Sequence, residues 1–451
     1  MKKPSLQTFL EADDGVVVIR EPVEPVYEIA AYLSLLDQGP AVIFDKVKGS
    51  NFRAVGNVLA TRESVSRALS VPLDGIEAAV LRAIDTTVDT VEVADAACQQ
   101  VVMADADLAA LPVPTFFEAE TGPYITAGVV IARDPLTGAG NASFARLKVL
   151  DAKSALIGIA PNHHLWRMAQ RSPSGRLDIA VVIGAHPAIQ LAACLYLNLG
   201  DDELHHAAPL LGRPVEVVGA RTVALRVPAE AEFVIEGTFD IHRREAEGLV
   251  SEFHGLYEDY GSAPRFEVSC ITHRRDALFQ VVLPGLHSEH AYLGATAIAA
   301  GLHRELARVV PSVTRVAVVE AGGGRLAAVV GLGPGRAGQA RRAMMTCWSS
   351  VSLVKQVTVV DAHVDPWDAV QVEHARVTLC RADRDIIVVP GMSADRSEPL
   401  ESEGTVAKIG YDATAKPGDR AEGFAPAAPP SAVLARVRDV LAGKGAAEGG
   451  H

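Results

Sequence analysis

Three polar side chains could together coordinate a metal ion. Asn141 follows the flexible stretch Gly138-Ala139-Gly140, His164 follows a proline turn, and Glu203 follows Gly200. An amide oxygen, an imidazole nitrogen and a carboxylate together suit a divalent ion such as Mn2+ or Mg2+, and the absence of thiolates disfavours structural zinc. Three protein ligands leave coordination positions open, which a cofactor phosphate could fill.

Two acids and an arginine form a second candidate set. Glu247 and Glu252 lie on an otherwise apolar segment that includes Gly248 and Gly255. A carboxyl group in an apolar pocket has its charged form destabilised, so its pKa rises and it can donate a proton near neutral pH. Arg146 would hold a second carboxylate ionised and present its planar fork to a substrate carboxylate. Solvated acids at the end of a strand are the alternative interpretation.

A glycine loop offers a rival chemistry. Gly333, Gly335 and Gly338 have the G-x-G-x-x-G spacing, follow an apolar run and precede a helical stretch, and a later strand ends at Asp361. Such glycines let a pyrophosphate approach a helix N-terminus, and the aspartate could accept a ribose hydroxyl. Pro334 stiffens the turn, however, and no complete second mononucleotide half follows. We therefore favour a plain strand-to-helix turn and keep an NAD(P)-dependent oxidoreductase as the alternative function.

The composition excludes several classes of protein. The 451 residues carry a net charge of -13, whereas neutralising nucleic-acid phosphates needs a basic stripe. The five cysteines are widely spaced and form no C-x-x-C pair, which indicates free thiols in a reducing compartment. No apolar region follows the N-terminal lysines to make a secretory signal, and the apolar stretch 177–199 is broken by Gly, His and Pro. We expect a cytoplasmic protein that binds neither nucleic acid nor membrane.

The elements that must position these residues follow a simple order. Short β-branched runs bounded by turn residues recur along the chain, and helical periodicity is clear over 26–36, 292–310 and 431–441. The middle of the chain is dense in strands, as expected of a β-barrel or sandwich. Strands and helices alternate on both sides of it, which favours α/β packing. The stretch 177–199 reads as a strand, a turn and a buried helix.

This order predicts an α/β (α+β) protein of three domains. We place an N-terminal α/β domain at 1–112, a central strand-rich domain at 113–300 and a C-terminal α/β domain at 301–451. A segment rich in Pro, Gly and Ala at 415–431 reads as a linker before the last helix. A helix joined through such a linker often docks on another subunit, so we expect a homo-oligomer.

The order of the motifs resembles the UbiD-like family of decarboxylases, which use prenylated FMN. The family pattern Asn-x-Ser-x-x-Arg matches Asn141, Ser143 and Arg146. The family's metal-binding histidine falls on His164, while the neighbouring His163 keeps the family's Pro-x-His pattern. Which of the two histidines is the ligand therefore stays open.

Further family positions follow along essentially the whole chain. The third metal ligand falls on Glu203, and the paired acids fall on Glu247 and Glu252. Three longer stretches also match: Ser288–Gly294, Lys355–Asp361 and Ala407–Thr414. The residues that depart from the family pattern around the acids are Leu249, Val250, Ser251 and Leu256. These departures change the pocket wall and leave the substrate open.

The resemblance implies a flavin anchored by a metal ion. Mn2+ (or Mg2+) on Asn141, His164 and Glu203 would hold the flavin phosphate, with K+ nearby and Lys355 as a candidate phosphate contact. The residues that would bind the cofactor are Asn141, Ser143, Phe144, Ala145, Arg146, Leu147, His164, Glu203 and Lys355. The prenylated FMN would act as the electron sink while the substrate loses CO2.

The resemblance also assigns roles in a reversible, non-oxidative decarboxylation. Glu252 would protonate the carbon that lost CO2, while Arg146 and Glu247 would position the substrate carboxylate. The family fold has an N-terminal α/β region, a central split β-barrel that binds the flavin and a C-terminal α/β domain with a terminal oligomerisation helix. The implied partners are a flavin prenyltransferase and an aromatic, heteroaromatic or α,β-unsaturated carboxylic acid. The resemblance leaves open the direction of the reaction and the choice between a dimer and a hexamer. It also leaves open the alternative of a cofactor-free assembly factor of the same fold.

Overall fold

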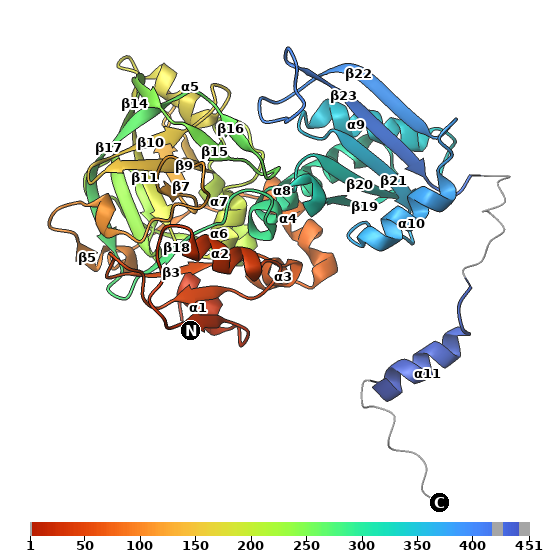
Figure 1. Cartoon of the computed structure of the whole chain (residues 1–451), viewed down its shortest axis with the longest axis horizontal. Coiled ribbons are helices and arrows are strands. Elements are labelled where there is room, and N and C mark those ends of the chain that lie inside the picture. The colour runs from red at the N-terminus through yellow and green to blue at the C-terminus, as the bar shows by residue number, and fades with distance from the viewer. Residues whose placement is uncertain (1, 417–426, 442–451) are drawn as a thin grey trace, which may run out of the picture.

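Nine strands from the middle of the chain form one antiparallel sheet that curls into a half-barrel (Figure 1). The computed structural model describes residues 2–416 and 427–441. The order across the sheet is β6, β9, β10, β17, β14, β11, β7 and β8, with the short β5 paired to β17. The bounds are β5 Val101–Val102, β6 Tyr124–Ile125, β7 Val129–Arg133, β8 Gly140–Phe144, β9 Arg146–Asp151, β10 Ser154–Gly158, β11 Arg176–Ile183, β14 Phe233–Ala246 and β17 Ser262–His273.

Both faces of this sheet are buried at its centre because the central strands are apolar on both sides. In β11, Ile179, Val181 and Ile183 join one hydrophobic cluster, whereas Ala180 and Val182 join another. Helices α2 and α5 pack in the first cluster, and α1, α3, α4, α6 and α7 pack in the second. Their bounds are α1 Leu6–Glu11, α2 Glu28–Leu35, α3 Arg62–Leu69, α4 Ile76–Asp85, α5 His164–Arg171, α6 Pro187–Ala192 and α7 Glu203–Leu211.

Three small sheets complete this lobe of the molecule. One has the order β1, β2, β3 and β18, and another has the order β13, β12 and β4. The third is the hairpin of β15 and β16, which follows the long strand β14, and the predicted acids lie before and after β15. The bounds are β1 Val17–Ile19, β2 Val42–Phe44, β3 Arg53–Gly56, β4 Val91–Glu92, β12 Glu216–Gly219, β13 Arg226–Pro228, β15 Leu249–Ser251, β16 Tyr257–Asp259 and β18 Leu278–Gln280.

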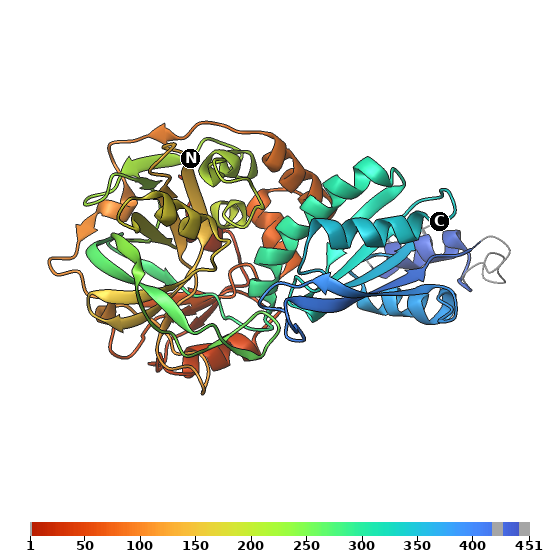
Figure 2. The same cartoon turned by 90° about the horizontal axis from the view of Figure 1, so that it is seen from above.

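The C-terminal domain is a second lobe with a five-stranded sheet between helices (Figure 2). Helix α8 reaches from the first lobe to this sheet, since it contacts both α4 and β19. Helices α8 and α9 cover one face of the sheet, while α10 covers the other. The sheet order is β19, β20, β21, β23 and β22. The bounds are α8 Ser288–Val309, β19 Val313–Val318, β20 Ala327–Leu332, α9 Gln339–Ser350, β21 Gln356–Asp361, α10 Ala369–Leu379, β22 Ile386–Ser393 and β23 Thr405–Ala413.

The predicted α/β class and the three predicted helices are confirmed. The three helices are α2, α8 and α11, the last spanning Ser431–Leu441. The apolar stretch 177–199 contains β11 and α6, as expected, and within the described ranges no helix has the length and apolarity needed to cross a membrane. Helix α11 stands apart from both lobes (Figure 1) and buries none of its residues. Its exposed apolar side chains include Val433, Val437, Val440 and Leu441.

Candidate active site

Arg146 and Glu247 form a buried ion pair at the centre of the candidate site. Arg146 begins β9, and Gly158 faces it on the paired strand β10, where a β-carbon would lie 2.7 Å from Arg146 Nε. The glycine therefore leaves room for the guanidinium. Nε and Nη2 of Arg146 donate to the two carboxylate oxygens of Glu247 at 2.8 and 2.9 Å, and only 2% of the Glu247 side chain is exposed. Burial lowers the pKa of Arg146, but the Glu247 carboxylate outweighs it, so this pKa lies above its ordinary value.

Glu252 follows β15 in the hairpin turn and faces the same guanidinium. Its carboxylate lies 3.6 Å from Nη1 of Arg146, and burial together with the Glu252 charge raises the pKa of the nearby Tyr260. The surroundings of Glu252 thus include a cation and a phenol, and they are more polar than the apolar segment in the sequence predicts. The cluster can bind a carboxylate at the guanidinium and deliver a proton from the adjacent acid.

A cavity of about 250 Å³ opens beside this cluster. Phe144 and Ala145, predicted to contact the cofactor, line it together with Arg146 and Glu252. The other lining residues are Glu120, Tyr124, Thr126, Gly158, Cys194, Val250, Ser251, Val282, Pro284, His290, Leu293 and Arg325. A concave apolar wall with a few converging polar groups is the usual form of a small-molecule site.

Asn141, His164 and Glu203 come together at the end of β8. Asn141 is buried, its Oδ1 lies 3.0 Å from His164 Nδ1, and its Nδ2 donates to Ser143 Oγ at 3.0 Å. Glu203 begins α7 and accepts a hydrogen bond from the backbone N–H of Ala142 at 2.6 Å. Residues from β8, α5 and α7, far apart in the sequence, therefore supply the predicted mixed oxygen and nitrogen set.

The charges in this set fit a divalent cation. Burial, with a smaller contribution from the Asp202 and Asp201 carboxylates, raises the pKa of Glu203 to about 8. Burial lowers the pKa of His164, so its ring is neutral and can ligate a metal. Burial and the two neighbouring carboxylates favour the protonated form of Glu203, and a bound metal ion would supply a compensating positive charge. Among the described residues, no group of three or more His, Cys, Asp or Glu side chains could hold a metal ion. A metal site here would therefore depend on the amide oxygen of Asn141.

His163 has a different environment from His164. It is the N-cap of α5, where its Nδ1 accepts a hydrogen bond from the backbone N–H of Leu165 at 3.3 Å. Burial, together with the nearby His164, lowers the pKa of His163 to about 4. One of its nitrogens is thus engaged in capping the helix, whereas His164 is the histidine that contacts Asn141.

Two of the predicted cofactor contacts lie elsewhere. The side chain of Leu147 is 1% exposed and packs inside the half-barrel. Lys355 precedes β21 in the C-terminal domain, where its ammonium is paired with the buried Glu398. Neither residue lines the cavity, and of the predicted cofactor contacts only Phe144, Ala145 and Arg146 do.

Lys148 and Glu120 belong to the cluster, although their spacing did not single them out. Lys148 lies two residues after Arg146 on β9, so both side chains leave the same face, and its ammonium donates to the backbone oxygen of Glu247. Burial lowers the pKa of Lys148. Glu120 accepts a hydrogen bond from Ser251 Oγ at 3.0 Å, and burial raises its pKa. Alternation along β9 is a signal that identifies Lys148, whereas Glu120 has no comparable signal.

The glycine loop has the form of a strand-to-helix turn, but its space is filled. β20 and β21 run parallel with α9 between them. The side chain of Gln339 donates to the backbone oxygen of Gly333 at 3.1 Å and accepts from Ser312 Oγ at 2.6 Å. The carboxylate of Asp361 accepts a backbone N–H from the segment after β23 at 2.9 Å. Gln339 therefore occupies the space that a pyrophosphate would need, which supports a plain turn.

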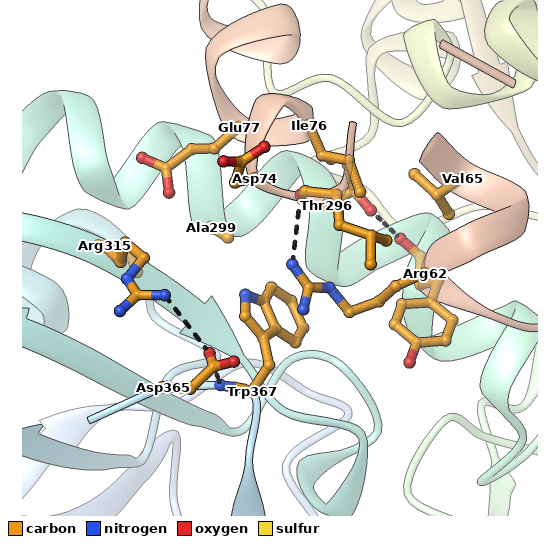
Figure 3. A pocket seen from close by; sticks show the side chains of 13 residues that line it. Arg62, Val65, Asp74, Ile76, Glu77, Thr296, Ala299, Arg315, Asp365 and Trp367 are labelled. Carbon is orange, nitrogen blue, oxygen red and sulfur yellow. Dashed lines mark hydrogen bonds and ion pairs between the residues drawn. The ribbon is translucent and has the colours of Figure 1, made fainter. Parts of the chain in front are cut away.

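A second cavity of about 210 Å³ lies between α3, α4, α8 and the C-terminal domain (Figure 3). The guanidinium of Arg62 stacks on Trp367 at 4.4 Å, and Arg315 lies 3.8 Å from Asp365. None of the predicted site residues lines this cavity. The cavity beside Arg146 is the better candidate for catalysis because one guanidinium there faces two predicted acids, the buried Glu247 and Glu252.

All three domains of one family match this chain. The N-terminal domain of 3-octaprenyl-4-hydroxybenzoate carboxy-lyase matches residues 8–84, its Rift-related domain matches 89–287 and its C-terminal domain matches 291–413. The half-barrel with its arginine–glutamate cluster is therefore that of a carboxy-lyase, and the chain belongs to the UbiD family of decarboxylases. The domain boundaries predicted from the sequence stay a prediction.

Curated relatives and solved structures agree with this family. The chain is 30% identical to the anhydromevalonate phosphate decarboxylases of Methanosarcina mazei and Methanothermobacter thermautotrophicus, over 90% and 91% of its length and 94% and 96% of theirs. The UbiD-class enzyme HmfF from Pelotomaculum thermopropionicum, in complex with FMN, superposes with a TM-score of 0.92 at 34% identity, covering 96% of this chain and 98% of HmfF. An evolved dimeric form of HmfF with prFMN gives a TM-score of 0.89 at 33% identity, covering 97% of this chain and all of that one.

Proposed function

We propose that this chain reversibly decarboxylates an aromatic, heteroaromatic or α,β-unsaturated carboxylic acid in the cavity beside Arg146. The observation that carries the proposal is the Arg146 guanidinium, which is shared between Glu247 at 2.8 Å and Glu252 at 3.6 Å at the wall of that cavity. A guanidinium recognises a carboxylate, and a carboxyl group beside it can exchange a proton with the reacting carbon.

The three residues divide the work of the reaction. Glu247 fixes the guanidinium by a bidentate pair, so Nη1 of Arg146 is held toward the cavity side, where Glu252 lies. The substrate carboxylate binds at the guanidinium, and the bond between the carboxyl carbon and its neighbour breaks as CO2 leaves. Glu252 then delivers one proton to the carbon that lost CO2, and it takes a proton from that carbon in the carboxylation direction.

A metal-anchored flavin fits the second cluster. Asn141, His164 and Glu203 would hold Mn2+ (or Mg2+), and the metal would bind the phosphate of prenylated FMN, with K+ nearby by resemblance to the family. The relatives solved with FMN and prFMN support the flavin. Prenylated FMN supplies the electron sink for decarboxylation. His164 is the proposed ligand because it contacts Asn141, whereas His163 caps α5.

The cavity favours a substrate with a second anionic group. Arg325 lines it and donates to the backbone oxygen of Gly323 at 2.8 Å, but it pairs with no carboxylate in the described part of the chain. A guanidinium without a counter-ion is a ready site for a carboxylate or phosphate. The relatives named anhydromevalonate phosphate decarboxylase act, by their name, on a compound that carries a phosphate.

The same proposal implies a supplier of the cofactor, a cellular compartment and an oligomeric state. A flavin prenyltransferase would supply the cofactor, and the protein would act in the cytoplasm, without nucleic acid or membrane. The exposed apolar side chains of α11 support a homodimer or higher homo-oligomer in which this helix packs on another subunit.

The test is the absorption spectrum and metal content of protein co-expressed with a flavin prenyltransferase. We expect a flavin band, about one divalent ion per chain, and CO2 release from a panel of unsaturated acids with and without a second anionic group. His164→Ala should lose metal and flavin together, while His163→Ala should keep both. Colourless, metal-free protein that binds NAD(P)H would overturn the proposal and favour the glycine loop.

A further inference from the structure

One hydroxyl group on the wall of the candidate cavity has no hydrogen-bond partner. It belongs to Tyr124 on β6, which lines the cavity together with Arg146 and Glu252. Only 2% of Tyr124 is exposed, and within the described part of the chain its hydroxyl is bonded to no other group. Burying a hydroxyl without a hydrogen bond is unfavourable, so such groups are rare in folded proteins. A ligand that enters the cavity would supply the missing partner.

Strand pairing places Tyr124 on the same face of the sheet as Arg146. Tyr124 lies opposite Lys148 in the antiparallel pairing of β6 with β9, and the side chains of opposite residues share one face. Arg146 precedes Lys148 by two residues on β9, so its side chain leaves that face as well. The hydroxyl and the guanidinium therefore come from neighbouring positions of one sheet face, beside the same cavity.

The polar groups around Tyr124 are engaged with one another. Both carboxylate oxygens of Glu247 accept hydrogen bonds from Arg146. The ammonium of Lys148 donates to the backbone oxygen of Glu247 and to Thr121 Oγ1. The protein thus satisfies the charged groups of the cluster without using the Tyr124 hydroxyl.

The other hydroxyl groups of the cavity wall differ from that of Tyr124. Thr126 Oγ1 accepts the backbone N–H of Val282 at 3.1 Å, and Ser251 Oγ donates to Glu120 at 3.0 Å. Both Thr126 and Ser251 line the cavity. Each of these hydroxyls joins two segments of the protein, whereas the hydroxyl of Tyr124 is left for a ligand.

The hydroxyl of Tyr124 is a hydrogen-bond donor. Burial, together with the Glu247 carboxylate, raises the pKa of Tyr124 above its ordinary value, so the hydroxyl keeps its proton at neutral pH. Hydrogen bonds from an O–H group to an ionised oxygen are shorter and stronger than those between neutral groups. A carboxylate is therefore the acceptor that suits this hydroxyl best.

We propose that Tyr124 is a substrate-binding residue whose hydroxyl donates a hydrogen bond to the substrate carboxylate that Arg146 binds. The inference rests on the proposed function, which places that carboxylate at the guanidinium. A second donor from a neighbouring strand fixes the orientation of a carboxylate that one guanidinium would leave free to pivot. The carboxylate gives up its charge as CO2 leaves, so this hydrogen bond is stronger in the bound substrate than in the transition state. Tyr124 therefore contributes to binding more than to rate.

The experiment compares binding and turnover of Tyr124→Phe and wild type. The probes are benzoate, cinnamate and terephthalate, of which the last carries a second carboxylate, and calorimetry on flavin-loaded protein gives their Kd. Tyr124→Phe should raise the Kd about tenfold for every probe that wild type binds, because it removes a hydrogen bond to a charged group. For any acid of the panel that wild type decarboxylates, KM should rise by a similar factor while kcat changes less than about threefold.

A stability measurement and a matched control separate ligand binding from a role in the fold. Tyr124→Phe should leave the urea midpoint of cofactor-free protein unchanged or raise it, because the hydroxyl that it removes has no partner in the fold. Tyr257→Phe is the control, since the Tyr257 hydroxyl accepts the backbone N–H of Ala119 at 3.2 Å and the residue lies outside the cavity wall. This control should keep the wild-type Kd for each probe.

Three results would overturn the inference while leaving decarboxylation in place. Unchanged Kd and KM in Tyr124→Phe would show that the hydroxyl touches no substrate, and a lower urea midpoint would then place it in the fold. Loss of flavin from Tyr124→Phe would place the hydroxyl on the cofactor. A weaker affinity for terephthalate alone would place it on the second anionic group. Flavin-loaded wild type that binds no probe and releases no CO2 from any acid of the panel would instead overturn the proposed function.

Discussion

Replacing Arg146 by methionine should destabilise the half-barrel because it leaves the buried Glu247 carboxylate without its partner. Methionine keeps an apolar stem but removes both hydrogen bonds to Glu247, whose side chain is 2% exposed. Removing one partner of a buried ion pair costs about 3–5 kcal/mol. We therefore expect Arg146→Met to lower the free energy of unfolding by about 3–5 kcal/mol at pH 7.

The assay is urea unfolding of cofactor-free protein at pH 7, followed by circular dichroism. Arg243→Met is the control, because Arg243 and Glu267 pair at the surface with side chains 55% and 45% exposed, so its effect should stay within about 1 kcal/mol. Arg146→Met combined with Glu247→Leu removes both partners and should recover most of the stability. A loss in Arg146→Met no larger than that of the control, or a double variant as unstable as the single one, would refute the reasoning.

Three further predictions test other parts of the molecule. Glu252→Gln should abolish CO2 release while the flavin absorbance is retained; loss of the flavin would place Glu252 in the cofactor site instead. Burial raises the pKa of Glu289 from 4.5 to about 7, so the folded protein loses stability as the pH rises through that window. Glu289→Gln, which keeps an oxygen to accept the backbone N–H of Leu59, should remove this part of the pH dependence in urea unfolding at pH 5 and 8, and an unchanged slope would contradict the assignment. A chain that ends at residue 416, without α11, should contain fewer subunits per particle by light scattering than the full chain, and an equal number of subunits would leave α11 without a role in assembly.

The sequence by itself determined the elements and the chemical groups. Helical periodicity placed α2, α8 and α11 within a few residues, because amphipathic spacing is a local property of the chain. The types and order of Asn141, His164 and Glu203 predicted a mixed ligand set, and the structure brings the three residues together. Local patterns could not decide whether the glycine loop binds a phosphate, since the same glycine spacing occurs in phosphate-binding loops and in a turn filled by a side chain such as Gln339.

Only the tertiary structure decided which groups face each other. Arg146 and Glu247 are separated by 101 residues, and their contact depends on the pairing of β9 with β10 and on the space that Gly158 leaves. The choice between His163 and His164 depends on which ring caps α5. Sequence spacing carries no information about such contacts, because side chains far apart in the chain meet only when strand register and domain packing place them within a few ångströms.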